Sequence, residues 1–297
     1  MRALADFIMR GRLQASLVVV AAAAAPMLFW LSAAAGSLVL LRRGLSDGLG
    51  VVAWALLPAL AWWFFGDPRP VLVVGGTLIL ALTLRKQASW RNVLLYSIAL
   101  GVLYSQVLGA VFGESIAVLA AEVQKLLPEA LPGVWDGMSA EQQEHLLSVF
   151  IAVMTGLLGA LLQTLAVLSL MLGRYWQATL YNPGGFGHEF RELRFSPMLA
   201  IALFAIVLMA PNFGPQAAIL TPLCSVPLAF ACLALVHGLV AQGRLARFWL
   251  VGLYVAMLLF LQFIYPLLAV LAVVDSLFDF RGRIPRGKNE GPTDGEG

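Results

Sequence analysis

The sequence contains few charged residues, and this shortage limits what the protein can be. Only 12% of its 297 residues are charged, whereas 61% are hydrophobic and the mean hydropathy is +0.88. Soluble domains carry about 25% charged residues, and disordered chains combine low hydrophobicity with high net charge. An outer-membrane barrel shows short alternating strands instead of long apolar blocks. The composition therefore excludes these three classes and predicts a helical membrane protein.

The chain also lacks any spacing that is typical of a disulfide or a metal site. Its two cysteines, Cys224 and Cys232, lie eight residues apart in one apolar block, which is too far for a disulfide on one helix. The three histidines fall in three separate segments, unlike the ligands of a zinc site. No nucleophile is placed with a base and an orienting group. We expect no metal, no other cofactor and no enzymatic activity.

The net charge of +3 reports orientation in the membrane and not a nucleic-acid partner, because cytoplasmic loops carry an excess of lysine and arginine. Seventeen of the 19 basic residues can be placed on one side, and only Arg69 and Lys125 then face outward. This arrangement puts both termini in the cytoplasm. It requires the first apolar block, residues 13–41, and the last, residues 248–280, each to cross and return.

Prolines indicate where these two blocks break. Pro26 lies near the middle of the first block and Pro266 within the last, and a proline inside a helix kinks or ends it. With the blocks between them, the chain holds about 8 to 10 membrane segments, some of them short or broken, at about 20 residues for a full span. We predict an all-α polytopic membrane bundle in which residues 1–280 form a single integral-membrane domain.

Two polar insertions and a tail interrupt the apolar pattern. Residues 114–145 carry six acidic side chains against one lysine, and residues 174–196 carry three arginines against two glutamates. The first is typical of an extracytoplasmic segment and the second of a cytoplasmic loop. Apolar residues at spacings of three and four over 116–127 predict an amphipathic helix that Pro128 ends, on the membrane surface or capping the bundle. The hydrophilic tail, residues 281–297, is expected to be disordered.

Polar side chains inside apolar blocks are costly in a bilayer and are candidates for function. For the glutamines and the threonine, hydrogen bonding between helices is the alternative, and for His237 it is an interfacial position near the cytoplasmic end. Asp275 and Asp279 precede Arg281 and Arg283 at spacings that favour structural ion pairs. The candidates for ligand binding are Gln106, Gln163, Thr164, His237 and Gln262.

The glycine-rich run at residues 184–187 lacks the pattern of a phosphate-binding loop. It predicts a tight turn that docks Phe186 and Phe190 at the membrane face, while Arg191 and Arg194 meet lipid headgroups or a protein partner. Small residues elsewhere favour close helix packing. These packing candidates are Ala21, Ala25, Gly156 and Ala160.

Two motifs carry a resemblance to a known family. They are Asn-Pro-Gly-Gly-Phe-Gly-His-Glu-Phe-Arg-Glu-Leu-Arg at residues 182–194 and Val-Asp-Ser-Leu-Phe-Asp-Phe-Arg at residues 274–281. On the basis of these two motifs, the chain resembles the uncharacterised YybS-like family of bacterial integral membrane proteins. The resemblance implies the bacterial inner membrane and a distant relation to the S components of energy-coupling-factor transporters, which are helical bundles with a ligand pocket. It also implies that Ala21 and Ala25 match small residues that dock a coupling subunit.

Two functions remain open at this point. In the first, the protein is a solute-binding or transport component with an S-component-like core, because interrupted spans often line binding sites. In the second, it is a membrane scaffold without transport activity that recruits cytoplasmic or envelope proteins through its basic loop and acidic insertion. The expected partners are the lipid bilayer, a small-molecule solute and a protein at the cytoplasmic loop. We expect no nucleic acid.

Overall fold

The protein is helical throughout the part of the chain that the structure describes. This computed structural model describes residues 2–130 and 133–282, so that nearly all of the tail expected to be disordered lies outside the described residues. The elements, in chain order, are α1 (Arg2–Arg10), α2 (Arg12–Ala24), α3 (Phe29–Arg43), α4 (Leu45–Phe64), α5 (Arg69–Gln87), α6 (Trp90–Ala130), α7 (Ala140–Tyr181), α8 (Gly185–Arg191), α9 (Pro197–Met209), the 3-10 helix η1 (Ala210–Phe213), α10 (Pro215–Ala218), α11 (Leu220–Ala241) and α12 (Phe248–Phe278).

Six helical segments among the described residues are long and apolar enough to cross a membrane. They are α4, α5, α6, α7, α10 together with α11, and α12, while α2 and α9 with η1 are shorter apolar helices. Large apolar side chains cover their outer faces, such as Trp54 on α4 and Leu258 on α12, which are 53% and 84% exposed. Apolar surface of this extent is suited to lipid contact. The predicted all-α polytopic membrane bundle is confirmed.

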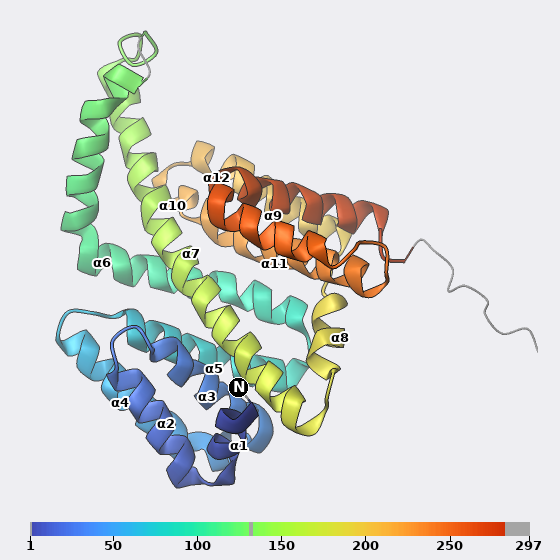
Figure 1. Cartoon of the computed structure of the whole chain (residues 1–297). Coiled ribbons are helices and arrows are strands. Elements are labelled where there is room, and N and C mark those ends of the chain that lie inside the picture. Colours follow the sequence, from blue (N-terminus) through green and yellow to red (C-terminus); the bar gives the residue numbers. More distant parts are fainter. Residues whose placement is uncertain (1, 131–132, 283–297) are drawn as a thin grey trace, which may run out of the picture.

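Helix α7 forms the centre of the bundle (Figure 1). Helices α3 and α5 pack against it on one side and α11 on another, and the first half of α6 crosses it. Two glycines permit these close contacts. A Cβ on Gly173 would lie 2.0 Å from Ser37 Oγ of α3, and one on Gly159 would lie 2.1 Å from Ser105 Oγ of α6. With 42 residues, α7 is about 63 Å long, about twice the hydrocarbon core of a bilayer.

The acidic insertion folds as a helical hairpin that projects from the bundle (Figure 1). Helix α6 bends at Phe112 (φ −110°, ψ 15°), and its second half runs beside the start of α7. The expectation that Pro128 ends the amphipathic helix is wrong, since α6 continues to Ala130. A proline removes one hydrogen-bond donor, and the two residues after it keep helical geometry. The segment projects together with α7 instead of capping the bundle.

Pro26 breaks the first apolar block, as the sequence predicts. Helix α2 ends at Ala24 and α3 begins at Phe29, and the two helices pack against each other as a hairpin. Ser32 Oγ of α3 donates to the Val19 carbonyl of α2 at 2.8 Å. A chain of 29 residues therefore leaves one end of the bundle and returns to it.

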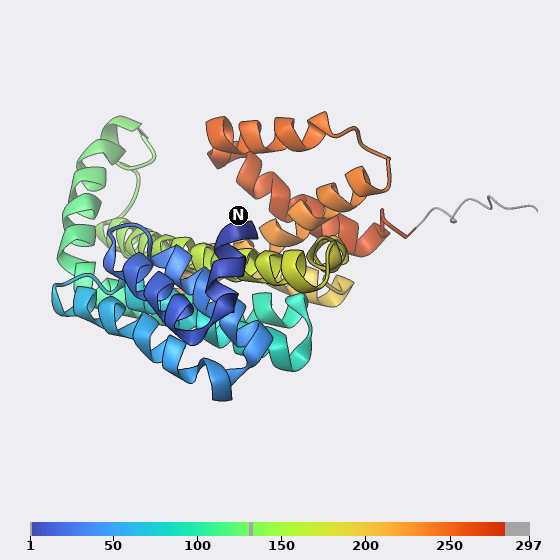
Figure 2. The ribbon, with the colours of Figure 1, turned by 60° about the horizontal axis from the view of Figure 1, so that its bottom comes forward.

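The last apolar block also turns back on itself, but at Phe260 and not at the predicted Pro266. Phe260 has non-helical dihedral angles (φ −131°, ψ 38°), and beyond it α12 runs back (Figure 2). A proline ring clashes with the carbonyl four residues earlier, which moves the distortion toward the preceding turn. Arg244, just before α12, donates to the Phe280 carbonyl just after it. Both ends of α12 therefore lie at the same end of the bundle.

Basic side chains gather at the end of the bundle opposite the acidic hairpin, which we call the basic end. Arg43 Nη2 donates to the Met9 carbonyl at 2.9 Å, and Arg85 Nη1 donates to the Leu41 carbonyl at 2.6 Å. Gln177 of α7 reaches the same Leu41 carbonyl at 3.3 Å. These contacts bring the ends of α1, α3, α5 and α7 together.

Arg69, at the start of α5 and away from the basic end, is neutralised locally. Its Nε and Nη2 atoms donate to the two carboxylate oxygens of Asp67 at 2.7 and 2.9 Å. Burial raises the pKa of the Asp67 carboxyl, but the hydrogen bonds from Arg69 lower it by more, so the pKa of Asp67 lies below its usual value. The carboxylate therefore stays ionised and compensates the arginine.

Candidate functional site

A groove at the basic end is the strongest candidate for a functional site. It has a volume of about 900 Å³ and lies between α7, α8, the second half of α11 and the start of α12; we call it the α7–α8–α11 groove. A mainly apolar and aromatic lining with few polar groups is typical of small-molecule sites. The lining residues are Leu168, Met171, Leu172, Tyr175, Ala178, Thr179, Gly184, Phe186, Gly187, Phe190, Arg191, Phe230, Leu233, His237, Val240, Ala241, Arg247, Leu250 and Tyr254.

The polar lining of the groove is cationic or neutral, since none of the lining residues in the described part of the chain is acidic. The ion pairs found among the described residues include neither Arg191 nor Arg247. His237 Nε2 and Tyr254 Oη are hydrogen-bonded at 2.9 Å, which joins α11 to α12 across the groove. Two arginines without a carboxylate partner in the described chain are available to an anion.

Aromatic rings form one wall of the groove. The rings of Phe186 and Phe190 are stacked with centroids 6.1 Å apart, and Phe190 meets the His237 ring edge-on at 5.6 Å. Both phenylalanines lie on α8, which begins after Gly184 in the left-handed region (φ 85°). Glycine adopts this conformation without strain, so the glycine-rich run makes the turn that directs α8 against the bundle.

An ion pair on the other face of α8 holds the aromatic wall in place. Arg174 of α7 binds both carboxylate oxygens of Glu189, one of them through Nε at 3.0 Å. Trp90 Nε1 of α6 also donates to this carboxylate at 3.3 Å. The Arg174 side chain is 14% exposed, and paired arginine forks of this kind fix geometry. Glu189 is therefore engaged outside the groove and does not neutralise Arg191.

The structure brings together residues that the sequence assigned to separate groups. His237, a ligand-binding candidate, lines the same groove as Phe186, Phe190 and Arg191, which were expected to contact headgroups or a partner. Arg194 lies elsewhere, since Nη2 donates to the Ser276 carbonyl at 3.0 Å and Nη1 pairs with an Asp279 oxygen at 2.8 Å. Sequence reasoning missed the other lining residues, among them Tyr175, Phe230, Arg247 and Tyr254. The two tyrosines and the arginine show the interfacial aromatic and basic signal.

The other four candidates for ligand binding lie outside the groove. Gln163 is buried, and its Nε2 donates to Ser97 Oγ at 2.9 Å and to the Leu223 carbonyl at 3.3 Å. It joins α6, α7 and α11, which is the alternative role of interhelical hydrogen bonding. The remaining three are on the periphery: Gln106 and Gln262 are exposed, and Thr164 is half-buried.

Two of the four packing candidates lie in helix contacts and two do not. A Cβ on Gly156 of α7 would lie 2.6 Å from the Ile219 carbonyl oxygen, and Ala160, one turn later, is buried. Ala21 is exposed and Ala25 lies in the turn after α2, so neither is packed in a helix contact. The packed face of α2 falls on different positions because of the 3.6-residue repeat. Its buried residues are Ala15, Val19, Ala22 and Ala23.

A buried ion pair closes the basic end next to the groove. Arg281 Nη2 lies 2.7 Å from Asp275 Oδ2, and their side chains are only 10% and 3% exposed. Arg281 Nη1 also donates to the carbonyls of Arg191 and Leu193 at 2.7 and 3.0 Å. The pair expected between these acidic and basic residues therefore forms at i,i+6, while Arg283 lies outside the described residues.

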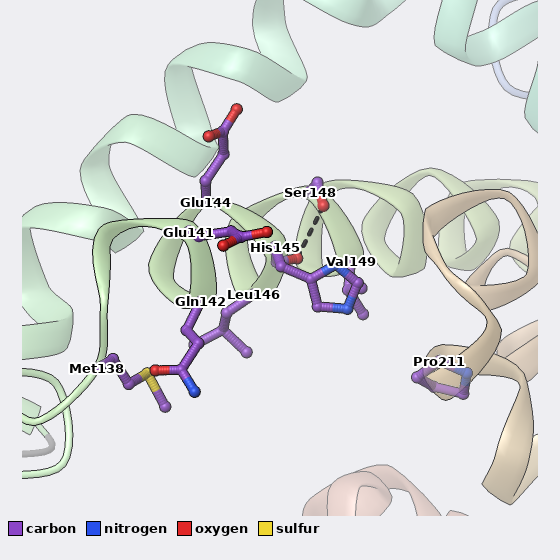
Figure 3. A pocket seen from close by; sticks show the side chains of 9 residues that line it. All are labelled: Met138, Glu141, Gln142, Glu144, His145, Leu146, Ser148, Val149 and Pro211. Carbon is purple, nitrogen blue, oxygen red and sulfur yellow. Dashed lines mark hydrogen bonds between the residues drawn. The ribbon is translucent and has the colours of Figure 1, made fainter.

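A second cavity, about 750 Å³, lies beside the acidic hairpin (Figure 3). Glu141, Glu144 and His145 of α7 line it, and Pro211 of η1 lies opposite them. The residues around these carboxylates are largely exposed, and no group of three metal-ligating side chains comes together in the described parts of the chain. Nothing in this cavity selects a ligand, in contrast to the groove.

Comparison with known proteins adds no relative. No protein-family model, no curated protein and no solved structure matches the chain. The resemblance to the YybS-like family stays a prediction that rests on its two motifs, and one of these motifs supplies α8 and Arg191, one of the two arginines of the groove.

Proposed function

We propose that the protein is a solute-binding component of a bacterial cytoplasmic membrane and that its ligand binds in the α7–α8–α11 groove. The groove itself carries the proposal, because cation, aromatic and apolar side chains from four helices line one volume of about 900 Å³. Sites of this size and composition hold small molecules.

The charges support an orientation for this proposal. By the positive-inside rule, we expect the basic end and both termini in the cytoplasm and the acidic hairpin outside. The groove then opens at the cytoplasmic side of the membrane. Bends at Phe112 of α6 and Phe260 of α12 interrupt two spans, and interrupted spans are a recurring feature of transporters. The exposed Ala21 leaves α2 accessible to a coupling subunit.

A scaffold is the second candidate function, and the projecting hairpin favours it. Val118, Leu119 and Leu126 on the second half of α6 are 65%, 53% and 60% exposed, away from the apolar bundle. Exposed apolar residues among acidic ones are suited to a protein contact. This role would be served at the end of the molecule opposite the groove, so the two functions can be separated by variants.

Thermal unfolding of the purified protein with a panel of charged and uncharged metabolites tests the proposal, combined with mass spectrometry of molecules that copurify. We expect a ligand that raises the melting temperature of the wild type and of Gln106→Leu, which lies outside the groove, but not of His237→Leu. A panel without effect and a protein without a copurifying molecule would contradict solute binding. A protein partner that is lost on Leu119→Glu, with no ligand found, would favour the scaffold.

A further inference from the structure

The charges of the groove select the sign of its ligand. Arg191 and Arg247 both line it, no acidic residue among those the structure describes does, and the nearby Glu189 is engaged by Arg174 and Trp90. An arginine guanidinium is always protonated and matches phosphate and carboxylate oxygens in a two-pronged contact. An anionic group at this position would gain charge-assisted hydrogen bonds, whereas a cationic ligand would be repelled.

The length of the groove matches one leaflet of a bilayer. Its lining runs along α7 from Leu168 to Thr179 and along α11 from Phe230 to Ala241. Eleven residue steps of a helix correspond to about 16 Å, and half of the hydrocarbon core is about 15 Å. The arginines lie at the basic end of this path, at Arg191 and Arg247, while the inner part is apolar. The groove is therefore charged at one end and apolar along the rest of its length, like the headgroup and hydrocarbon regions of a single leaflet.

The groove is also accessible from the lipid side. Leu168, Tyr175 and Tyr254 line it and are 48%, 46% and 47% exposed. They lie on the membrane-spanning helices α7 and α12, so a chain could enter sideways without leaving the membrane. A freely water-soluble anion would gain nothing from the apolar inner part, because only apolar groups benefit from being buried there.

We propose that the ligand of the α7–α8–α11 groove is an anionic membrane lipid that enters from the bilayer. Its phosphate lies between Arg191 and Arg247, and one acyl chain runs along the wall formed by Phe190, Phe230 and Leu172. This inference rests on the proposed function and gives it a ligand class. Basic pockets between helices on the cytoplasmic side are suited to anionic headgroups.

Native mass spectrometry of the full chain released from nanodiscs tests the charge requirement. The nanodiscs contain equal amounts of phosphatidylglycerol and phosphatidylcholine, and the bound lipids are counted. We expect retention of phosphatidylglycerol over phosphatidylcholine, and a fall in bound phosphatidylglycerol of about tenfold or more in the Arg191→Gln, Arg247→Gln variant. Lys86→Gln, Arg91→Gln removes the same charge from the basic end outside the groove and should retain the lipid. An equal loss in both variants would overturn the proposal.

A second variant tests the position without changing charge. The three atoms nearest to a Cβ on Gly187 belong to the Arg191 guanidinium, each at 3.9 Å, and Gly252 on α12 has open space around it. Gly187→Trp should fill the groove and displace the lipid, whereas Gly252→Trp should not. Unchanged lipid in Gly187→Trp would overturn the assignment of the site.

The same measurements separate this inference from the proposed function. Equal binding of phosphatidylcholine, or displacement of the lipid by inorganic phosphate at equal concentration, would overturn the anionic lipid but keep a ligand in the groove. Absence of any bound molecule, in nanodiscs and in the metabolite panel alike, would overturn both.

Discussion

Two pairs of arginines at the basic end, one pair in each half of the molecule, differ in their partners. In the N-terminal half, Arg43 and Arg85 donate to backbone carbonyls at 2.9 and 2.6 Å. In the C-terminal half, Arg191 and Arg247 line a groove of about 900 Å³ and have no carboxylate partner among the described residues. The first pair closes the bundle, and the second pair leaves it open to a ligand.

The difference shows that position along the membrane normal does not by itself determine what a basic residue does. Helix α3 ends at Arg43, and the last carbonyls of a helix lack partners within it. Arg85 supplies one of these missing donors, so its charge contributes to the fold. At the groove, no such acceptor from residues 2–130 or 133–282 binds the side chain of Arg191 or Arg247, and the positive charge remains for an anion.

The largest loss of stability is expected at Arg281, an arginine of the C-terminal half that binds groups of the protein itself, as Arg43 and Arg85 do in the N-terminal half. Arg281→Ala leaves Asp275 buried without its partner, which should lower the free energy of unfolding by about 3–5 kcal/mol. Unfolding in a denaturing detergent titration measures it. Arg2→Ala is the control, because Arg2 and Asp6 are 74% and 51% exposed at 4.0 Å, and its cost should stay below about 1 kcal/mol. Equal effects would contradict a structural role for the buried pair.

Overfilling the contact between α3 and α7 should have the next largest effect. Gly173→Leu places atoms against Ser37 Oγ and the Ala34 carbonyl, since even a Cβ would lie 2.0 and 2.8 Å from them. We expect a loss of stability of about 1–3 kcal/mol, measured by the same titration. Gly75→Leu is the matched control, because nothing lies within 4 Å of its Cβ position. A tolerated Gly173→Leu would show that the N-terminal half is not closed as tightly as described.

Arg85→Gln tests the closing role of an arginine directly. The shorter side chain loses the hydrogen bonds to the Leu40 and Leu41 carbonyls at 3.2 and 2.6 Å, and these are partly exposed to solvent. We expect a loss of about 1 kcal/mol in the free energy of unfolding. Lys86→Gln removes the same charge from the adjacent exposed position and should change stability by less than about 0.5 kcal/mol.

The general fold could be predicted from the sequence because a bilayer allows few solutions. Helices satisfy their own backbone groups in lipid, so apolar blocks predict spans, and Pro26 predicts the first break. The position of the break in the last block could not be predicted. A proline such as Pro266 indicates that the helix bends nearby, but it does not determine which residue adopts the non-helical dihedral angles. Phe260 bends where α12 reverses along α11, and this contact is not encoded in any local pattern.

The candidate site was predictable only in part. His237 stands out as a polar residue in an apolar block, and Arg191 as a basic residue of a cytoplasmic loop. Their meeting in one groove depends on α8 folding back against α7 and α11, which involves contacts between distant segments. Gln163 is also a polar residue in an apolar block, but it lies outside the groove and forms a buried hydrogen bond between helices.

Arg191→Gln should have the smallest effect on stability, and it sharpens the comparison most. Its side chain makes no ion pair within the described chain, and the backbone carbonyl that Arg281 binds at 2.7 Å is retained in the variant. We expect a change below about 0.5 kcal/mol in the free energy of unfolding, against the larger loss in Arg85→Gln. Such a result would mean that the fold gains little from this arginine, as expected for a side chain whose partner is a ligand. A loss equal to that of Arg85→Gln would instead place Arg191 among the structural arginines and remove the contrast between the two halves.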